Sequence, residues 1–227
     1  INTLEDYKNQ LNETDFVHDK IKFFSIMQDF RKYLASIKDL NLCNLIYHSK
    51  SYNKYKTFFR ERNYFYMRSV ECVEAFSIMT KGIHAEENFS KLIDKEYIHT
   101  RYEKKINELR SLDFSKAETM VCVWCWPMPE TILFIYENTD IENIIWIDNS
   151  SEAIYIAWEM IWALWLKNIS LVHIDWEKYD FKDADIVYIP WFVYPKNLIL
   201  DRIVKTWKKD VQILVDSSVF LQKMLFD

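Results

Sequence analysis

The chain has 227 residues, a length that suits one or two domains, and half of these residues are hydrophobic, which is enough for a sizeable core. A formal net charge of −5 argues against a nucleic-acid partner, and no apolar run approaches the roughly 18 residues that a membrane span needs. Four cysteines, with no signal peptide opening the sequence, predict reduced thiols and a cytoplasmic protein.

Residues 1 to about 112 have the apolar periodicity of helices. Between Asp15 and Ile37, hydrophobic side chains recur every three or four residues. The same spacing predicts further helices at 41–48, 51–62, 64–80, 85–92 and 97–112. We therefore expect an all-helical N-terminal domain over residues 1–114.

From Met120 onward, the pattern changes to alternating strands and helices. Short apolar runs predict strands at 120–124, 143–147, 169–174, 185–190 and 211–215. Helical spacing predicts helices at 128–138, 151–164 and 196–206. Alternation of this kind requires right-handed crossovers between parallel strands, so we expect an α/β fold with a doubly wound, Rossmann-like sheet over residues 115–227. Because the sequence stops soon after the fifth strand, we also expect a C-terminal truncation.

Glycine is almost missing from this chain, whereas tryptophan is abundant. There is one Gly and there are nine Trp, although average usage of about 7% would give roughly 16 glycines. All nine tryptophans follow residue 120: Trp124, Trp126, Trp146, Trp158, Trp162, Trp165, Trp176, Trp191 and Trp207. We interpret them as UGA codons that the source organism reads as glycine. A C-terminal half that is genuinely rich in tryptophan is the alternative.

Most of these tryptophans lie where turns favour glycine. Trp124 and Trp126 occupy the turn between the first strand and the next helix. Trp165 follows a helix, at the place of a left-handed residue, and Trp207 closes another helix. Trp176 lies at a strand end where Asp-Gly would turn. If the residues are tryptophan as written, we expect the first loop to be unable to bind a cofactor, because an indole does not adopt positive φ cheaply.

With glycine at 124 and 126, the first loop has the form G-x-G-x-P-x-T between a strand and a helix. Such a loop presents backbone N–H groups to a cofactor, which assigns Trp124, Cys125, Trp126 and Pro127 to binding. The third glycine of a dinucleotide-binding loop is absent, and no P-loop lysine follows. These differences favour S-adenosylmethionine over NAD or a nucleoside triphosphate.

Acidic residues end the second and third predicted strands. Asp148, which lies 24 residues after Trp124, can accept the ribose hydroxyls of a nucleoside, and Asp175 can meet an adenine amino group. Asn149 and Trp176, the residues that follow them, are assigned to the same site. The competing interpretations are a helix N-cap region at Asp148 and an ordinary turn at Asp175.

The end of the fourth predicted strand supplies the remaining candidates. Pro190 is assigned to the cofactor site, and Tyr194 and Lys196 are candidate substrate contacts. Lys196 alternatively begins a helix. Cys122 and Cys125 have redox spacing, but no second cysteine pair and no His-Glu-x-x-His motif accompany them, so we expect no metal site.

With glycine at 126, the segment Gly-Pro-Met-Pro-Glu-Thr131 resembles the Gly-Pro-Leu-Pro-Leu-Thr loop of nicotianamine synthases and related bacterial opine-metallophore synthases. The segment 101–112 is similar to the helix, rich in Arg and Tyr, that leads to this loop in the family. The resemblance covers residues 60–226. It implies a helical domain before a class I methyltransferase-type domain, and metallophore biosynthesis as the function. It also implies transfer of the 3-amino-3-carboxypropyl group of S-adenosylmethionine to a small amine or amino acid, with release of methylthioadenosine.

The resemblance further implies two catalytic residues, Glu74 and Tyr102, with Glu71 as an alternative. The chain departs from the family after its fifth strand. There it has Asp216-Ser-Ser-Val-Phe-Leu-Gln222 in place of Arg-x-x-x-Gly-x-Arg. Two alternatives therefore stay open: an S-adenosylmethionine-dependent methyltransferase with a helical cap, and a degenerate Rossmann domain without catalysis. The oligomeric state is not predicted.

Overall fold

A computed structural model describes residues 2–16, 18–80, 107–124, 130–190, 193–207 and 210–216. Two compact units are distinguished, residues 1–69 and residues 70–216. The boundary between these units lies within a helix, whereas the domain boundary placed at 114/115 by the change of sequence pattern remains a prediction. Within the part of the chain that the structure describes, no helix is both long and apolar enough to cross a membrane.

The first unit is helical. Its helices are α1 (Asn2–Asn12), α2 (Lys20–Ser36), α3 (Leu40–Tyr47) and the first part of α4 (Lys50–Thr80). Asp19 and Asp39 cap α2 and α3, because each side chain accepts hydrogen bonds from backbone N–H groups of the first helical turn. The apolar stripe of α2 contributes the fully buried Met27, Phe30 and Leu34 to the core.

Helix α2 begins at Lys20, although the predicted apolar periodicity begins at Asp15, and the helices expected at 85–92 and over most of 97–112 lie outside the described residues. The helical region differs from the sequence-based expectation at two further places. Helix α1 was not predicted, because Leu4 and Leu11 are its only described core residues and they give too weak a periodicity. The two helices expected at 51–62 and 64–80 are one helix of 31 residues, α4. Asn63 interrupts the apolar pattern between them, but it is buried and accepts a 2.9 Å hydrogen bond from Nη1 of Arg31, so the helix continues through it.

The second unit contains a parallel sheet of five strands in the order β3-β2-β1-β4-β5. The strands are β1 (Thr119–Val123), β2 (Asn143–Asp148), β3 (Ile169–His173), β4 (Ile186–Ile189) and β5 (Gln212–Val215). Each lies within one residue of its predicted bounds. The predicted fold class, a doubly wound α/β sheet preceded by helices, is confirmed.

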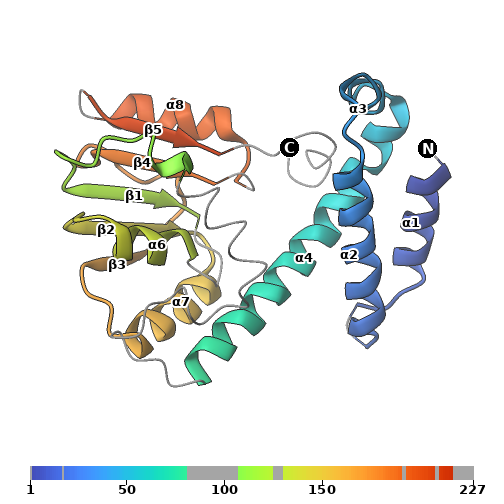
Figure 1. Cartoon of the computed structure of the whole chain (residues 1–227), viewed down its shortest axis with the longest axis horizontal. Coiled ribbons are helices and arrows are strands. Elements are labelled where there is room, and N and C mark those ends of the chain that lie inside the picture. The colour runs from blue at the N-terminus through green and yellow to red at the C-terminus, as the bar shows by residue number, and fades with distance from the viewer. Residues whose placement is uncertain are drawn as a thin grey trace. The chain divides into compact units, whose positions relative to one another are not determined.

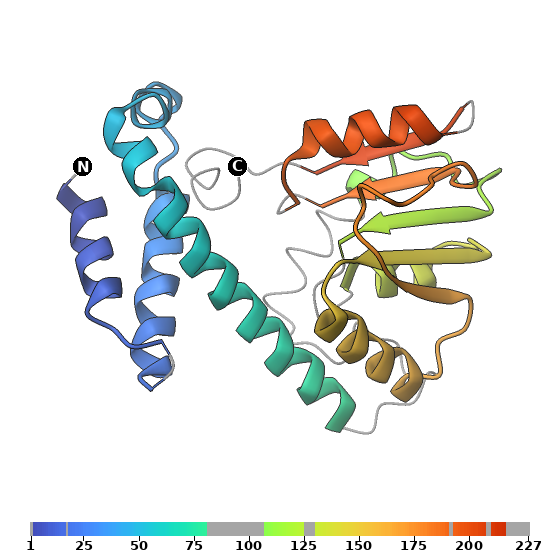
Figure 2. The same cartoon turned by 180° about the vertical axis from the view of Figure 1, so that it is seen from behind.

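Helices cover both faces of the sheet. On one face, α6 (Glu130–Asn138) and α7 (Ser151–Ala163) pack against alternate strand residues such as Met120 and Cys122 (Figure 1). On the other face, α8 (Lys196–Thr206) packs against Val121 and Val123 (Figure 2). Because both faces are covered, the central strands β1, β2 and β4 consist of nearly continuous apolar runs rather than alternating ones.

The last part of α4 belongs to this second unit. Ala75 lies in a cluster with Ile156, Met160 and Leu164 of the α7 region, and Cys72 packs against the same cluster. The last part of α4, which carries the predicted catalytic glutamate, therefore packs on α7 within the second unit.

Candidate functional site

The strand order places the candidate binding residues at one edge of the sheet. Because all pairings are parallel, the carboxyl ends of β1, β2, β3 and β4 share this edge. The chain runs outward from β1 to β3 on one side and to β4 and β5 on the other, so the order reverses between β1 and β4. Ligands of open α/β sheets bind outside the carboxyl ends of the strands at this reversal. Trp124, Asp148, Asp175 and Pro190 all follow or end strands at this edge, as the sequence predicted.

Trp124 is the first residue after β1, and its backbone has the conformation of a glycine. Its N–H donates a 2.7 Å hydrogen bond to the carbonyl of Ile147, which extends the pairing with β2. Its φ is 68°, in the left-handed region, where a Cβ atom costs about 1–2 kcal/mol. The loop predicted to approach the cofactor therefore begins at a residue whose backbone favours glycine over tryptophan. Cys125, Trp126 and Pro127 lie outside the described residues.

Asp148 ends β2 as a buried carboxylate with 3% of its surface exposed. Its Oδ1 accepts a 2.7 Å hydrogen bond from the N–H of Ser150. The cap of α7 is Ser150, whose Oγ accepts from the N–H of Ala153, so Asp148 itself is not the N-cap. Asn149 is exposed, and its carbonyl oxygen lies 3.1 Å from Nε2 of His173. A carboxylate held in this way at the strand end suits the ribose hydroxyls of a nucleoside.

Asp175 lies in a tight turn after β3. Its Oδ1 accepts a 3.0 Å hydrogen bond from the N–H of Glu177, and its carbonyl accepts one from the N–H of Lys178. The turn interpretation is therefore correct, and it is compatible with ligand binding because a carboxylate has several acceptor positions. The expectation that Trp176 takes a glycine-like turn conformation is wrong. Its φ is not positive, and its indole is buried against the face of the sheet that α8 covers.

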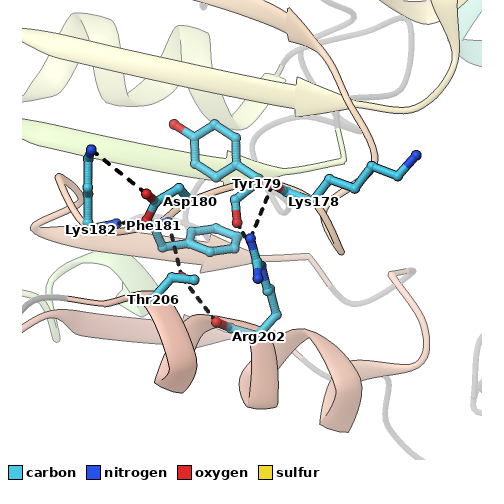
Figure 3. A network of polar contacts seen from close by, with 7 residues as sticks. All are labelled: Lys178, Tyr179, Asp180, Phe181, Lys182, Arg202 and Thr206. Atoms are coloured by element: carbon cyan, nitrogen blue, oxygen red, sulfur yellow. Dashed lines mark hydrogen bonds and ion pairs between the residues drawn. The ribbon is translucent and has the colours of Figure 1, made fainter.

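Helix α8 holds the segment that follows this turn (Figure 3). Nε of Arg202 donates a 2.9 Å hydrogen bond to the carbonyl of Tyr179, and Nη2 donates a 3.2 Å bond to that of Lys178. One turn further along α8, Oγ1 of Thr206 accepts from the N–H of Phe181 at 3.1 Å. Phe181 is fully buried, and its ring meets that of Tyr179 edge to face. These contacts fix the backbone only three to six residues beyond Asp175.

The phenol of Tyr179 belongs to the same segment. Burial raises its pKa above the ordinary value of 10.0, and the carboxylates of Asp183 and Asp180 raise it further. The phenol is therefore neutral at physiological pH, which suits a side chain that packs against the ring of Phe181.

The fourth and fifth strands also end in candidate residues. Pro190 is buried directly after β4, whereas Tyr194 is exposed. Lys196 is the first residue of α8, which agrees with the alternative that it begins a helix. Asp216 was not selected from the sequence. It is buried after β5, and its N–H donates to the carbonyl of Ile189 at the end of β4. The available signal was that Asp216 ends the fifth apolar run as Asp148 ends the second.

The predicted catalytic residues are located only in part. Glu74 lies on α4, and its side chain is outside the described residues, as is Tyr102 altogether. Glu71 lies one turn earlier on α4, with Oε2 shielded from solvent. The roles of all three therefore stay predictions. Within the described ranges, no three His, Cys, Asp or Glu side chains gather in a group that could hold a metal ion.

The chain matches no protein-family model and no curated protein sequence. It is similar to crystal structures of MtNAS, a nicotianamine synthase. Against the complex of MtNAS with MTA and tNA, the TM-score is 0.81 at 13% identity, over 99% of this chain and 85% of that one. The chain has the fold of MtNAS. A Glu-to-Gln variant of MtNAS in complex with S-adenosylmethionine gives a TM-score of 0.74 at 14% identity, over 99% of this chain and 84% of that one.

At this level of identity, the similarity to MtNAS shows a shared fold rather than a shared activity. The match thereby supports the fold class predicted from the sequence, a parallel sheet preceded by helices, and it covers the helical region as well as the sheet. The similarity also agrees with the loop motif at 126–131, although the motif itself lies almost entirely outside the described residues.

Proposed function

We propose that this chain is a transferase that uses S-adenosylmethionine as a substrate and moves its 3-amino-3-carboxypropyl group to a small amine or amino acid, releasing methylthioadenosine. The observation that carries the proposal is the match to MtNAS over 99% of the chain, which includes the helical region as well as the sheet. MtNAS has been crystallised with MTA and tNA, and its Glu-to-Gln variant with S-adenosylmethionine. In this proposal the product is a metallophore and the protein works in the cytoplasm.

The residues at the carboxyl edge of the sheet are proposed to bind the nucleoside. Asp148 accepts the two ribose hydroxyls, and Asp175 accepts the adenine amino group with the carboxylate positions that its turn does not use. The loop at 124–127, with glycine at 124 and 126, supplies backbone N–H groups. Asn149, Pro190 and the backbone at position 176 are proposed to complete the walls around the nucleoside; the indole of Trp176 is buried on the face of the sheet that α8 covers.

The transfer itself requires an amine that is held in line with the carbon to be attacked, and a base for its proton. The amine nitrogen forms a bond to the γ-carbon of the aminocarboxypropyl chain while the bond from that carbon to the sulfonium sulfur breaks. The bonding electron pair stays on sulfur, which becomes the neutral thioether of methylthioadenosine. Glu74 is proposed to take the proton from the amine, with Glu71 as the alternative, and Tyr102 to hold the acceptor substrate.

Methyl transfer is the second candidate function, because one observation favours it. The segment from Asp216 to Gln222 lacks both arginines found at this place in nicotianamine synthases. Without these cations, the carboxylate of an amino-acid substrate loses a binding partner, whereas a methyl acceptor does not need one. In this case the products contain S-adenosylhomocysteine.

Product analysis tests the proposal. The protein with glycine at all nine tryptophan positions is incubated with S-adenosylmethionine and a mixture of amines and amino acids. Methylthioadenosine formed in proportion to enzyme supports aminocarboxypropyl transfer, and S-adenosylhomocysteine supports methylation. If titration calorimetry of the same protein detects no binding of S-adenosylmethionine, both candidate functions are wrong and the domain is degenerate.

A further inference from the structure

The residues with a positive φ angle are of two kinds: residue types that tolerate this conformation, and tryptophan. Four non-glycine residues of the described ranges have positive φ: Trp124 (68°), Trp165 (55°), Asn168 (62°) and Asp210 (75°). Asn and Asp tolerate this region because their short polar side chains bond to the local backbone. Tryptophan has no such compensation. Among the described residues, two positions with positive φ carry neither Gly, Asn nor Asp, and both of them, 124 and 165, are tryptophan.

Trp165 occupies a helix C-terminus whose hydrogen bonds are those of a Schellman motif. The N–H of Leu166 donates to the carbonyl of Ile161, and the N–H of Trp165 donates to that of Trp162, each at 3.1 Å. These two bonds define Trp165 as the residue directly after the cap, and that place usually belongs to glycine because its φ is positive. The motif is complete here in every respect except the residue type.

Several of the other tryptophans lack the surroundings that a tryptophan normally has. Trp158 and Trp162 expose 53% and 62% of their surface on α7, and Trp207 exposes 42% after α8. Trp146 is buried in β2, and its Nε1 has no hydrogen-bond partner, although a buried indole N–H usually finds one. Of the described tryptophans, Trp176 alone is buried with no such defect.

We propose that positions 124 and 165 are glycine in the protein that the source cell makes, and that all nine tryptophans correspond to UGA codons decoded as glycine. The composition, with a single glycine, and the two left-handed backbones support this independently of each other. The proposal concerns the identity of the residues, so it does not depend on which reaction the protein catalyses. It also explains why a cofactor loop of recognisable form begins with an indole.

Mass spectrometry of the natural protein tests the proposal. Cleavage after glutamate releases the peptide 160–177, which carries positions 162, 165 and 176 together. We expect the mass and fragment ions of glycine at all three positions, and UGA at the corresponding codons of the gene. The reference is the same peptide from a synthetic gene with UGG codons, which yields tryptophan. Tryptophan at any of the three positions in the natural peptide, or UGG in the gene, overturns the proposal.

Discussion

Replacing Trp165 by glycine should stabilise the protein relative to replacing it by alanine. Both substitutions remove the same exposed indole and its stacking against Trp162, so these losses cancel in the comparison. What remains is the backbone: at φ 55° alanine retains the left-handed cost of about 1–2 kcal/mol, whereas glycine does not. Glycine loses more chain entropy on folding than alanine does, which costs about 0.5–1 kcal/mol. After this cost is subtracted from the left-handed cost of alanine, the net advantage of glycine is on the order of 0.5–1 kcal/mol.

Trp158 supplies the matched control for this prediction. It is exposed on the same helix, but it lies within α7, where φ is not positive. There glycine is less favourable than alanine by about 1 kcal/mol. The order of the two variants should therefore reverse between the two positions.

Thermal unfolding, followed by circular dichroism, measures both pairs. For a domain of this size, about 1 kcal/mol corresponds to roughly 2–4 °C in melting temperature. We expect Trp165→Gly to melt about 1–4 °C above Trp165→Ala, and Trp158→Gly to melt about 2–4 °C below Trp158→Ala. If alanine is as good as glycine at position 165, the left-handed backbone does not limit stability there and the reasoning is refuted.

Three further predictions concern the site, all measured in the protein with glycine at the tryptophan positions. Asp148→Asn should weaken binding of S-adenosylmethionine about 10- to 100-fold in calorimetry, because hydrogen bonds to a charged group contribute about 1.5–3 kcal/mol. The control Asp140→Asn, at an exposed residue just before the opposite end of β2, should leave binding unchanged. Arg202→Gln should raise the KM for S-adenosylmethionine by on the order of tenfold without changing kcat, because it removes the hydrogen bonds that hold the segment after Asp175. Lys205→Gln on the same helix is the control, and an equal effect of this substitution would contradict the prediction. Glu74→Gln should lower kcat about 10²–10⁴-fold with cofactor affinity retained, and unchanged turnover would remove this residue from the mechanism.

The central strands β1, β2 and β4 were predictable because each is a short apolar run that is mostly buried on both faces, and the partly exposed edge strands β3 and β5 still keep most of their apolar residues. The carboxyl edge followed from the same pattern, since parallel strands bring Asp148 and Asp175 to one side. The left-handed backbones at Trp124 and Trp165 were also predictable, because each follows the last residues of a regular element. The same argument failed at Trp176, where the side chain of Asp175 builds the turn without a positive φ.

Features that depend on contacts between distant segments were not predictable. The continuity of α4 rests on Arg31, which satisfies a buried Asn63 from another helix. The hydrogen bonds from Arg202 to the segment after β3 join residues more than 20 positions apart, and no local pattern indicates them.

The prediction of a glycine-like helix end at Trp207 was wrong. The φ of Trp207 is −67°, and the chain leaves α8 in an extended conformation.

The central claim is that this chain transfers an aminocarboxypropyl group from S-adenosylmethionine, and one chromatographic measurement tests it most directly. The protein with glycine at the nine tryptophan positions is incubated with S-adenosylmethionine and the amine mixture, with its Asp148→Asn variant as the control. We predict methylthioadenosine as the nucleoside product, formed only when an amine is present and strongly reduced in the control. Accumulation of S-adenosylhomocysteine instead of methylthioadenosine would contradict the claim.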